Sequence, residues 1–300
     1  MGSSQQQTVY APTPQPPLAP LVEKTNHQLE AQIAMIAEEA KGRVGVGAVM
    51  LETGDAAWLD RHGHFPSQSV YKLPIAMAAL KMVDDARLRL GQDAMVSRED
   101  FVRQGFHSPI RNLNPSGTVL PVLMLLHYSI SESDGTANDV LLDLVGGPPA
   151  VQSYLTSLGV TDFIVADSTK SISKDWETQY RNWATPEDSI KLLRTLQDRV
   201  ALSEESTDLL LEFMKGSDIG GRRLKRGIPE GATVAHKTGT GGTKDGLSSA
   251  TNDIGIITLP DGRHIAIAVY ISDSSADGYT RQRVIADIAK AVCEKWVAKG

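Results

Sequence analysis

Cysteine is almost absent from this chain of 300 residues, which contains Cys293 and no other. A single thiol cannot form an intrachain disulfide. No grouping of Cys and His residues has the spacing of a structural zinc site either. We therefore expect neither a metal nor any other cofactor.

Long apolar runs and blocks of like charge are also missing. No run reaches the roughly 18 residues that a membrane-spanning helix requires, and the start of the chain has no charged-plus-apolar export signal. The net charge is −6, with acidic and basic residues intermixed. This pattern argues against binding to nucleic acid or to an anionic membrane, and it fits a small-molecule or cell-wall partner better.

The chain does have enough apolar sequence, 41% of its residues, to bury one large core or two moderate ones. Residues 1–22 are rich in Pro and Gln and are predicted to be a flexible tether. In the rest of the chain, apolar residues recur at helical spacing near both ends. In the segments next to these helices, the residue pattern alternates as in β-strands. The predicted helices are 24–40 and 281–297, and the predicted strands are 43–51, 55–60, 233–237, 252–259 and 264–272.

Almost everything between these ends has the 3.6-residue period of helices. The segments are 73–88, 120–129, 137–144, 149–158, 186–196 and 203–215. The order of elements predicts an α/β (α+β) fold. In it, residues 23–66 and 216–300 form a discontinuous α/β domain, and residues 67–215 form an inserted all-helical domain.

Ser69 and Lys72 stand at the start of a predicted buried helix, in the sequence Ser-Val-Tyr-Lys. At this spacing the amine lies one helical turn from the hydroxyl. A serine hydroxyl is a weak nucleophile until a base removes its proton, and a desolvated lysine can be neutral enough to do so. The spacing alone is weak evidence, because Ser171 and Lys174 repeat it in a polar stretch.

Ser133, Asp134 and Gly135 follow one predicted helix and begin the next. In such a loop the Ser133 hydroxyl could relay a proton to a leaving group. The alternative is that this Ser-Asp pair only caps the helix over 137–144.

A third motif, Lys-Thr-Gly-Thr-Gly over 237–241, continues a predicted strand. Alternate side chains of a strand point the same way, and glycines let a substrate approach the backbone. Lys237 would supply positive charge, and the hydroxyls of Thr238 and Thr240 could bind a carboxylate. Read alone, the motif also fits a strand that ends in a flexible turn.

Together, in this order, the three motifs resemble those of class A β-lactamases and penicillin-binding proteins. The resemblance spans residues 24–299 and includes Q-Y-R-N-W-A-T-P and V-A-H-K-T-G-T-G-G, which are similar to the PER/VEB-like branch. It implies a β-lactamase/transpeptidase-like fold, with an antiparallel sheet flanked by the terminal helices. It also implies a serine hydrolase that opens β-lactam rings through an acyl-enzyme.

The resemblance implies a role for each motif residue. Ser69 would be the nucleophile, Lys72 the proton acceptor and Ser133 the proton shuttle to the ring nitrogen. Lys237 and Thr240 would hold the substrate carboxylate. The backbone N–H groups of Ser69 and Thr240 would form the oxyanion hole.

An arginine also supports the carboxylate in this family, from either of two places. The strand position is occupied here by Thr251, so we assign the role to Arg223. A plain surface arginine is the alternative. His107 would lie near the wall of the cleft, although a surface-loop histidine is the other interpretation.

The sequence departs from the family pattern at two positions. Gly135 stands where the family usually has Asn, and the side-chain amide that would bind the acylamido carbonyl of the substrate is lost. Thr169 stands where the family has the Glu that positions the deacylating water. Asp167 and Glu177 are alternative carboxylates at less suitable distances along the chain. If none of them acts, the acyl-enzyme should persist.

Three functions therefore stay open. The first is a β-lactam hydrolase, and the second is a penicillin-binding, DD-peptidase-like enzyme for D-Ala-D-Ala-like substrates. The third is a catalytically silent binding protein of the same fold. We expect a monomer that is periplasmic or secreted.

Overall fold

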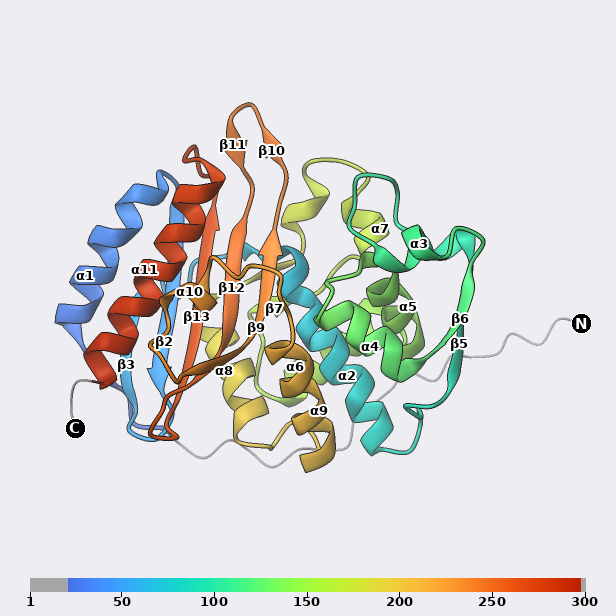
Figure 1. Ribbon diagram of the computed structural model, residues 1–300, viewed down its shortest axis with the longest axis horizontal. Helices are drawn as coiled ribbons and strands as arrows, with labels where there is room; N and C mark the ends of the chain where they lie inside the picture. Colours follow the sequence, from blue (N-terminus) through green and yellow to red (C-terminus); the bar gives the residue numbers. More distant parts are fainter. Residues whose placement is uncertain (1–20, 298–300) are drawn as a thin grey trace, which may run out of the picture.

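The computed structural model describes residues 21–297, so all but the last two residues of the predicted tether lie outside the described part. A six-stranded sheet occupies one side of the molecule, in the order β1-β3-β2-β13-β12-β9 (Figure 1). Its strands are β1 (Lys24–Thr25), β2 (Arg43–Met50), β3 (Asp55–Leu59), β9 (Thr233–Thr240), β12 (Thr251–Thr258) and β13 (His264–Ser272). The pair β1–β3 is parallel and the other pairs are antiparallel.

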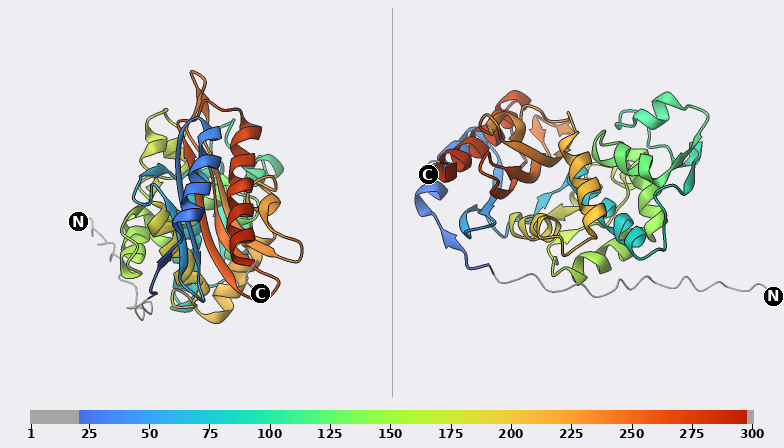
Figure 2. Two further views of the ribbon diagram at one scale, coloured as in Figure 1. Left: turned by 90° about the vertical axis from the view of Figure 1, so that its left-hand side faces the viewer. Right: turned by 60° about the horizontal axis from the view of Figure 1, so that its bottom comes forward.

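Both ends of the chain build this sheet. Helices α1 (His27–Ala37) and α11 (Gly278–Val297) lie side by side over one face (Figures 1 and 2). A first core lies between these helices and the sheet, and it includes Leu29, Ile33 and Trp296. Strand β13 is apolar along both faces because its other face packs against the helical side of the molecule.

The other side of the molecule is mainly helical. Its longer helices are α2 (Lys72–Asp84), α4 (Val122–Ile130), α5 (Gly135–Val145), α6 (Gly147–Ser157), α8 (Pro186–Gln197) and α9 (Glu204–Lys215). Helix α2 is central: each of its residues from Lys72 to Met82 is buried. Apart from Lys72 and Lys81, these residues are apolar on every side of the helix, as its burial requires. Within residues 21–297 no helix is both long and apolar enough to cross a membrane.

The segment 67–215, predicted to be all helical, contains short strands as well. Strands β5 (Asp93–Val96) and β6 (Thr118–Pro121) form a ribbon, and β7 (Phe163–Ile164) and β8 (Trp183–Ala184) pair with β4 (Phe65–Pro66) in a small sheet. In β5, alternate residues are buried and exposed over four positions. A pattern this short does not stand out in a sequence, which explains the missed strands.

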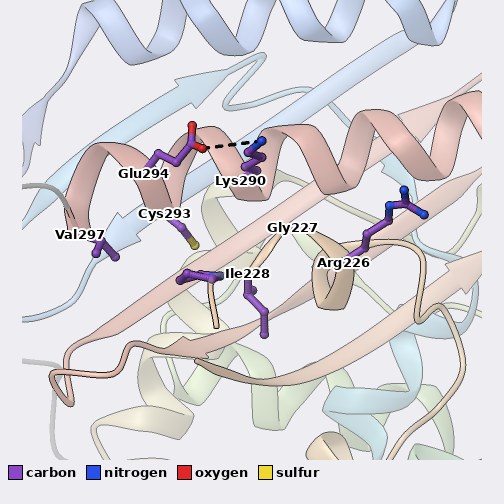
Figure 3. Close-up of a pocket in the computed structure, with 8 residues that line it drawn as sticks. Arg226, Gly227, Ile228, Lys290, Cys293, Glu294 and Val297 are labelled. Atoms are coloured by element: carbon purple, nitrogen blue, oxygen red, sulfur yellow. Dashed lines mark ion pairs between the residues drawn. The ribbon is translucent and has the colours of Figure 1, made fainter. Parts of the chain in front are cut away.

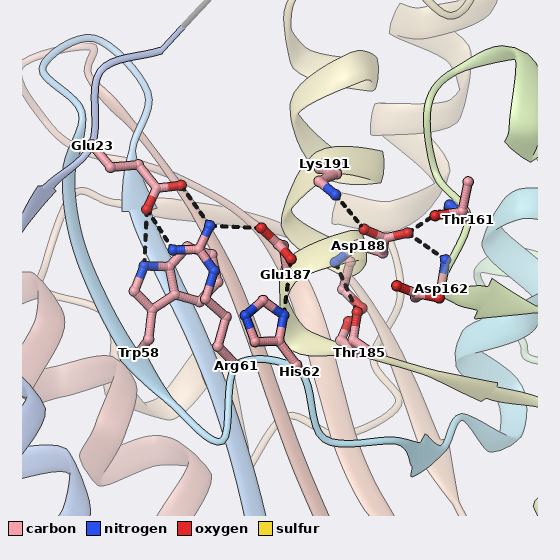
Figure 4. Close-up of polar contacts among 11 residues, drawn as sticks. Glu23, Trp58, Arg61, His62, Thr161, Asp162, Thr185, Glu187, Asp188 and Lys191 are labelled. Atoms are coloured by element: carbon pink, nitrogen blue, oxygen red, sulfur yellow. Dashed lines mark hydrogen bonds and ion pairs between the residues drawn. The ribbon is translucent and has the colours of Figure 1, made fainter.

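The predicted helix over 24–40 also begins later than expected. Residues 24–25 form β1, and Asn26 then caps α1 by accepting the backbone N–H of Leu29 at 3.0 Å. Glu23, just before β1, is joined by Arg61 to Glu187 of α8, with nitrogen–oxygen distances of 2.8 and 2.7 Å (Figure 4). This contact fastens the first described residues to the helical side.

Candidate active site

Ser69 lies in the 3₁₀ turn η2 (Gln68–Tyr71), immediately before α2. Gln68 has a φ of 49°, in the left-handed region that a residue with a side chain rarely adopts. Such a conformation costs about 1–3 kcal/mol and persists only where the surroundings fix it. Here Nε2 of Gln68 donates to Oε1 of Gln179 at 3.0 Å. The turn that presents Ser69 is therefore held from outside.

Strand β9 packs directly against this turn. A Cβ atom on Gly239 would lie 2.4 Å from the carbonyl oxygen of Ser67, so only glycine allows the approach. From β12, Nδ2 of Asn252 donates to the carbonyl oxygens of Pro66 and Ser67 at 2.8 and 3.2 Å. These contacts bring the Lys-Thr-Gly motif next to the serine.

Two lysines converge on Ser133. Nζ of Lys237 donates to Oγ of Ser133 at 2.9 Å, while Nζ of Lys72 donates to the carbonyl oxygen of Ser133 at 2.5 Å and lies 3.5 Å from its Oγ. Both lysines are almost fully buried, and Ser133 is itself held at a φ of 52°. The structure thus brings Lys72 and Lys237, which are far apart in the sequence, to one hydroxyl group.

Burial changes the acid–base properties of both amines. It lowers the pKa of Lys72 to about 8, although the negative charges of Asp134 and Asp139 partly offset the effect. With this pKa, about a tenth of the Lys72 side chains are neutral at pH 7. Burial, and next the positive charge of Lys72, lower the pKa of Lys237 well below its ordinary value. Lys72 thus has the properties of a proton acceptor.

Asp134 serves as a helix cap, as the alternative reading of the Ser-Asp pair predicts. Its carboxylate accepts the backbone N–H of Ala137 at 2.9 Å and that of Ile110 at 2.7 Å. It also accepts the hydroxyl of Ser108 at 3.0 Å. Asp134 caps the helix, and its neighbour Ser133 contacts the two lysines, so both interpretations of the Ser-Asp pair hold.

Arg223 is buried, which excludes the interpretation as a surface arginine. Nη1 donates to the carbonyl oxygens of Gly239 and Asn252 at 3.0 and 2.8 Å, and Nη2 donates to Oγ1 of Thr240 at 2.6 Å. The guanidinium group therefore spans β9 and β12 directly behind the predicted carboxylate site.

A second arginine, Arg281 of α11, lies at the same end of the sheet. Its Nε donates to Oγ1 of Thr251 at 2.8 Å, and Thr251 pairs with Thr240 across the strands. Burial lowers the pKa of Arg223, and the charge of Arg281 lowers it further. We did not predict Arg281 from the sequence, because nothing local marks a residue of the last helix as the neighbour of this strand.

Three further predicted site residues lie around the motifs. Thr238 is buried, and its methyl group fills the space beside Gly220, where a Cβ atom would lie 2.4 Å from it. The side chain of His107 is exposed, with Nε2 2.8 Å from the carbonyl oxygen of Glu132. Gly135 donates its backbone N–H to the carbonyl oxygen of His107 at 3.0 Å.

Thr169 begins the short helix α7 (Thr169–Ile172) and is buried beside the serine turn. Its hydroxyl oxygen lies 2.8 Å from the phenol oxygen of Tyr71, which belongs to the same turn as Ser69. Asp139 accepts the backbone N–H of Thr169 at 2.7 Å. The predicted position of the deacylating carboxylate is thus beside the serine turn, and a threonine occupies it.

The alternative carboxylates are placed differently. Asp167 pairs with Nε of Arg181 at 3.1 Å, and Glu177 is exposed. In the second Ser-x-x-Lys motif, Oγ of Ser171 lies 3.4 Å from Oγ of Ser168.

A cavity of about 270 Å³ opens beside the serine turn. One part of its lining comes from the turn and the end of β9, and the other part includes aromatic and apolar side chains. The first part is Gln68, Thr240 and Gly241, and the second includes Phe106, Ile172 and Trp176. A pocket with apolar walls and a few polar groups suits a small organic substrate.

A larger cavity of about 550 Å³ lies between α10 (Leu224–Gly227) and α11 (Figure 3). The Cys293 thiol points into it, and a Lys290–Glu294 ion pair lies at its edge (Figure 3). Burial raises the pKa of Cys293 to about 12, so the thiol stays neutral and unreactive near pH 7. The smaller cavity is therefore the one that adjoins the predicted catalytic motifs.

Comparisons with known proteins identify the family of the chain. The sequence profile of the "Beta-lactamase enzyme family" matches residues 28–296. β-Lactamase VEB-1 of Pseudomonas aeruginosa is 36% identical over 273 residues, which cover 90% of this chain and 91% of the relative. The extended-spectrum β-lactamase PER-1 of the same organism is 37% identical over 262 residues, which cover 87% and 85%.

A solved β-lactamase structure from Chitinophaga pinensis superposes with a TM-score of 0.87 at 40% identity, covering 89% of this chain and 99% of that chain. The protein therefore belongs to the β-lactamase enzyme family, as a class A β-lactamase of the PER/VEB-like branch that hydrolyses β-lactams.

Proposed function

We propose that β-lactams acylate Ser69 and that this acylation is faster than the hydrolysis of the acyl-enzyme. One observation carries the proposal. Two buried lysines, Lys72 and Lys237, meet at the hydroxyl of Ser133 beside the serine turn, whereas Thr169 stands where a deacylating carboxylate is expected. The groups that acylation needs for proton transfer are therefore present, whereas deacylation lacks a general base.

In the acylation step, the neutral amine of Lys72 takes the proton of Ser69 as its oxygen attacks the lactam carbonyl carbon. The backbone N–H groups of Ser69 and Thr240 stabilise the oxyanion, at about 3 kcal/mol for each donor. The C–N bond then breaks. Ser133 gives its proton to the ring nitrogen and regains one from Lys72, with which it is in contact.

The substrate carboxylate binds to Lys237 and the hydroxyls of Thr238 and Thr240. Arg223 donates to Oγ1 of Thr240, so the proton of this hydroxyl is free to point at the substrate. The positive charge of Arg223 and the N–H donors of Lys237 favour an anion at this place. Gly135 offers no side chain for the acylamido group, and His107 is exposed, with its Nε2 2.8 Å from the carbonyl oxygen of Glu132.

The hydroxyl group of Thr169 is not basic enough to act by itself as the general base for a hydrolytic water near neutral pH. Deacylation therefore lacks the general base that commonly contributes about 10²–10⁴-fold. The same observation favours a second function, a DD-peptidase-like enzyme in which the acyl group persists. Release of D-Ala from a peptide ending in D-Ala-D-Ala would reveal this activity. For either function we propose a monomer that acts in the periplasm or outside the cell.

Intact-mass spectrometry after mixing with a penicillin tests the assignment of Ser69. The wild-type protein should gain the mass of the penicillin, and Ser69→Ala should gain nothing while its thermal unfolding stays that of a folded protein. Ser171→Ala is the matched control, because it removes the serine of the second Ser-x-x-Lys motif, and it should be labelled normally. Labelling of Ser69→Ala would refute the assignment.

A further inference from the structure

Thr169 lies in a buried polar cluster that acylation does not use. Its hydroxyl oxygen is 2.8 Å from the phenol oxygen of Tyr71 and 3.5 Å from Nδ2 of Asn138. The carboxylate of Asp139 accepts the backbone N–H groups of Thr169 and Lys170 at 2.7 and 2.8 Å. Because the side chains of this cluster are buried, each of their polar hydrogens needs an acceptor within the protein.

This requirement sets the direction of the hydrogen bonds. Within residues 21–297, the hydrogen-bond partner of the Tyr71 phenol is the hydroxyl of Thr169. If Thr169 donated to Tyr71, the phenol proton would have no acceptor. Tyr71 therefore donates to Thr169, and Thr169 turns its own proton toward the carboxylate of Asp139.

Burial dominates the ionisation of both partners. Burial, and next the negative charge of Asp139, raise the pKa of Tyr71, which keeps the phenol protonated and able to donate. Burial also raises the pKa of Asp139, and hydrogen bonds from Lys170 and Thr169 partly offset that rise. The carboxylate of Asp139 is therefore a stronger base than that of an exposed aspartate.

We propose that Tyr71 is a positioning residue that slows hydrolysis of the acyl-enzyme, because its phenol occupies the lone pair of Thr169 that a hydrolytic water would need. Tyr71 and Asn138 together use both lone pairs of this hydroxyl. The blocked route runs from water through Thr169 to the carboxylate of Asp139. The inference rests on the proposed acylation of Ser69.

Removal of the phenol oxygen opens this route. Water then donates a proton to Oγ1 of Thr169, while Thr169 passes its own proton to Asp139. The water oxygen forms a bond to the ester carbon of acylated Ser69. As the bond from that carbon to Oγ of Ser69 breaks, the proton on Asp139 returns through Thr169 to this oxygen. The product leaves as the acid, and every group regains its starting protonation.

Tyr71→Phe removes the phenol oxygen and keeps the ring. We expect the deacylation rate constant, measured as the decay of the penicillin adduct in intact-mass spectra, to rise at least about tenfold. The acylation rate constant, measured separately in stopped flow, should change much less. In this variant the deacylation rate should also rise with pH as Asp139 loses its proton, and then level off.

Tyr270→Phe is the matched control, because Tyr270 is also buried and its phenol lies 2.8 Å from the hydroxyl of Ser189. The adduct of this control should decay at the wild-type rate. Adding Asp139→Asn to Tyr71→Phe should abolish the gain.

An adduct lifetime in Tyr71→Phe within twofold of wild type would overturn the inference. So would an equal shortening of the adduct lifetime in Tyr270→Phe. Each of these results presupposes that the wild-type adduct forms. If the wild-type protein formed no adduct, the proposed acylation of Ser69 would be refuted instead. Failure of the role of Tyr71 and failure of the proposed function therefore give different results.

Discussion

A Cβ atom on Gly135 would lie 2.8 Å from the γ-methyl group of Thr169, closer than two carbon atoms can approach without a shift. It would also lie 3.2 Å from Cγ1 of Val102. The two positions at which the chain departs from the class A pattern are therefore in contact. Threonine fits at 169 because residue 135 has no side chain, so the two departures are coupled.

Gly135→Asn should for this reason destabilise the protein. Overpacking of a filled site costs about 1–3 kcal/mol, measured as the free energy of unfolding in urea. Thr169→Ser removes the methyl group and keeps the hydroxyl, so adding it to Gly135→Asn should restore part of the loss. Strict additivity of the two substitutions would show that the residues do not interact.

The lowered pKa of Lys72 predicts how acylation depends on pH. The amine is the proton acceptor only when neutral, and burial lowers its pKa to about 8. The acylation rate should therefore be small at pH 6, rise as the pH passes through about 8, and then level off. Stopped-flow acylation with a penicillin between pH 5.5 and 9.5 measures this limb. A rate independent of pH over this range would exclude Lys72 as the base.

Arg223→Ala should weaken the recognition of substrates that carry the ring carboxylate. A hydrogen bond to a charged group contributes about 1.5–3 kcal/mol, which corresponds to a loss of about 10- to 100-fold in kcat/KM. Arg223→Lys should recover little, because an ammonium group cannot reproduce the contacts of the guanidinium fork to two strands. The exposed neighbour is the control: if Arg222→Ala has an equal effect, Arg223 has no specific role.

The strands and motifs with strong local signals were predictable. β13 (His264–Ser272) matches its predicted bounds because its apolar run ends at a clear turn on one side. Ser69, Lys72, Ser133 and Lys237 were predicted from three short motifs and from their resemblance to a known family. The spacing of these residues in the sequence could not predict that both lysines contact Ser133, which the structure shows.

Contacts between distant segments were not predictable. Arg281 meets Thr251 only because α11 packs beside the end of β12. The bond between Tyr71 and Thr169 likewise joins the serine turn to a loop whose sequence carries no periodic signal. Such contacts depend on how helices and strands pack together. A single sequence shows which face of an element is apolar, but not which other element covers that face.

Thr169→Glu should accelerate deacylation by about 10²–10⁴-fold, the usual contribution of a positioned general base. The carboxylate of Asp139 is close by, and a like charge raises the pKa of a carboxyl group. The gain should therefore grow with pH as the introduced side chain ionises. The decay of the penicillin adduct at several pH values measures it, and an adduct lifetime equal to that of wild type at every pH would contradict the assigned position.

Rapid mixing of the wild-type protein with a chromogenic cephalosporin tests the central claim most directly. If acylation is faster than deacylation, a burst of about one equivalent of product per enzyme should precede a slow steady state. The slow phase should not change in Glu177→Gln. Rapid turnover without a burst, lost in Glu177→Gln, would contradict the account, because it would show that the exposed Glu177 is the deacylating base.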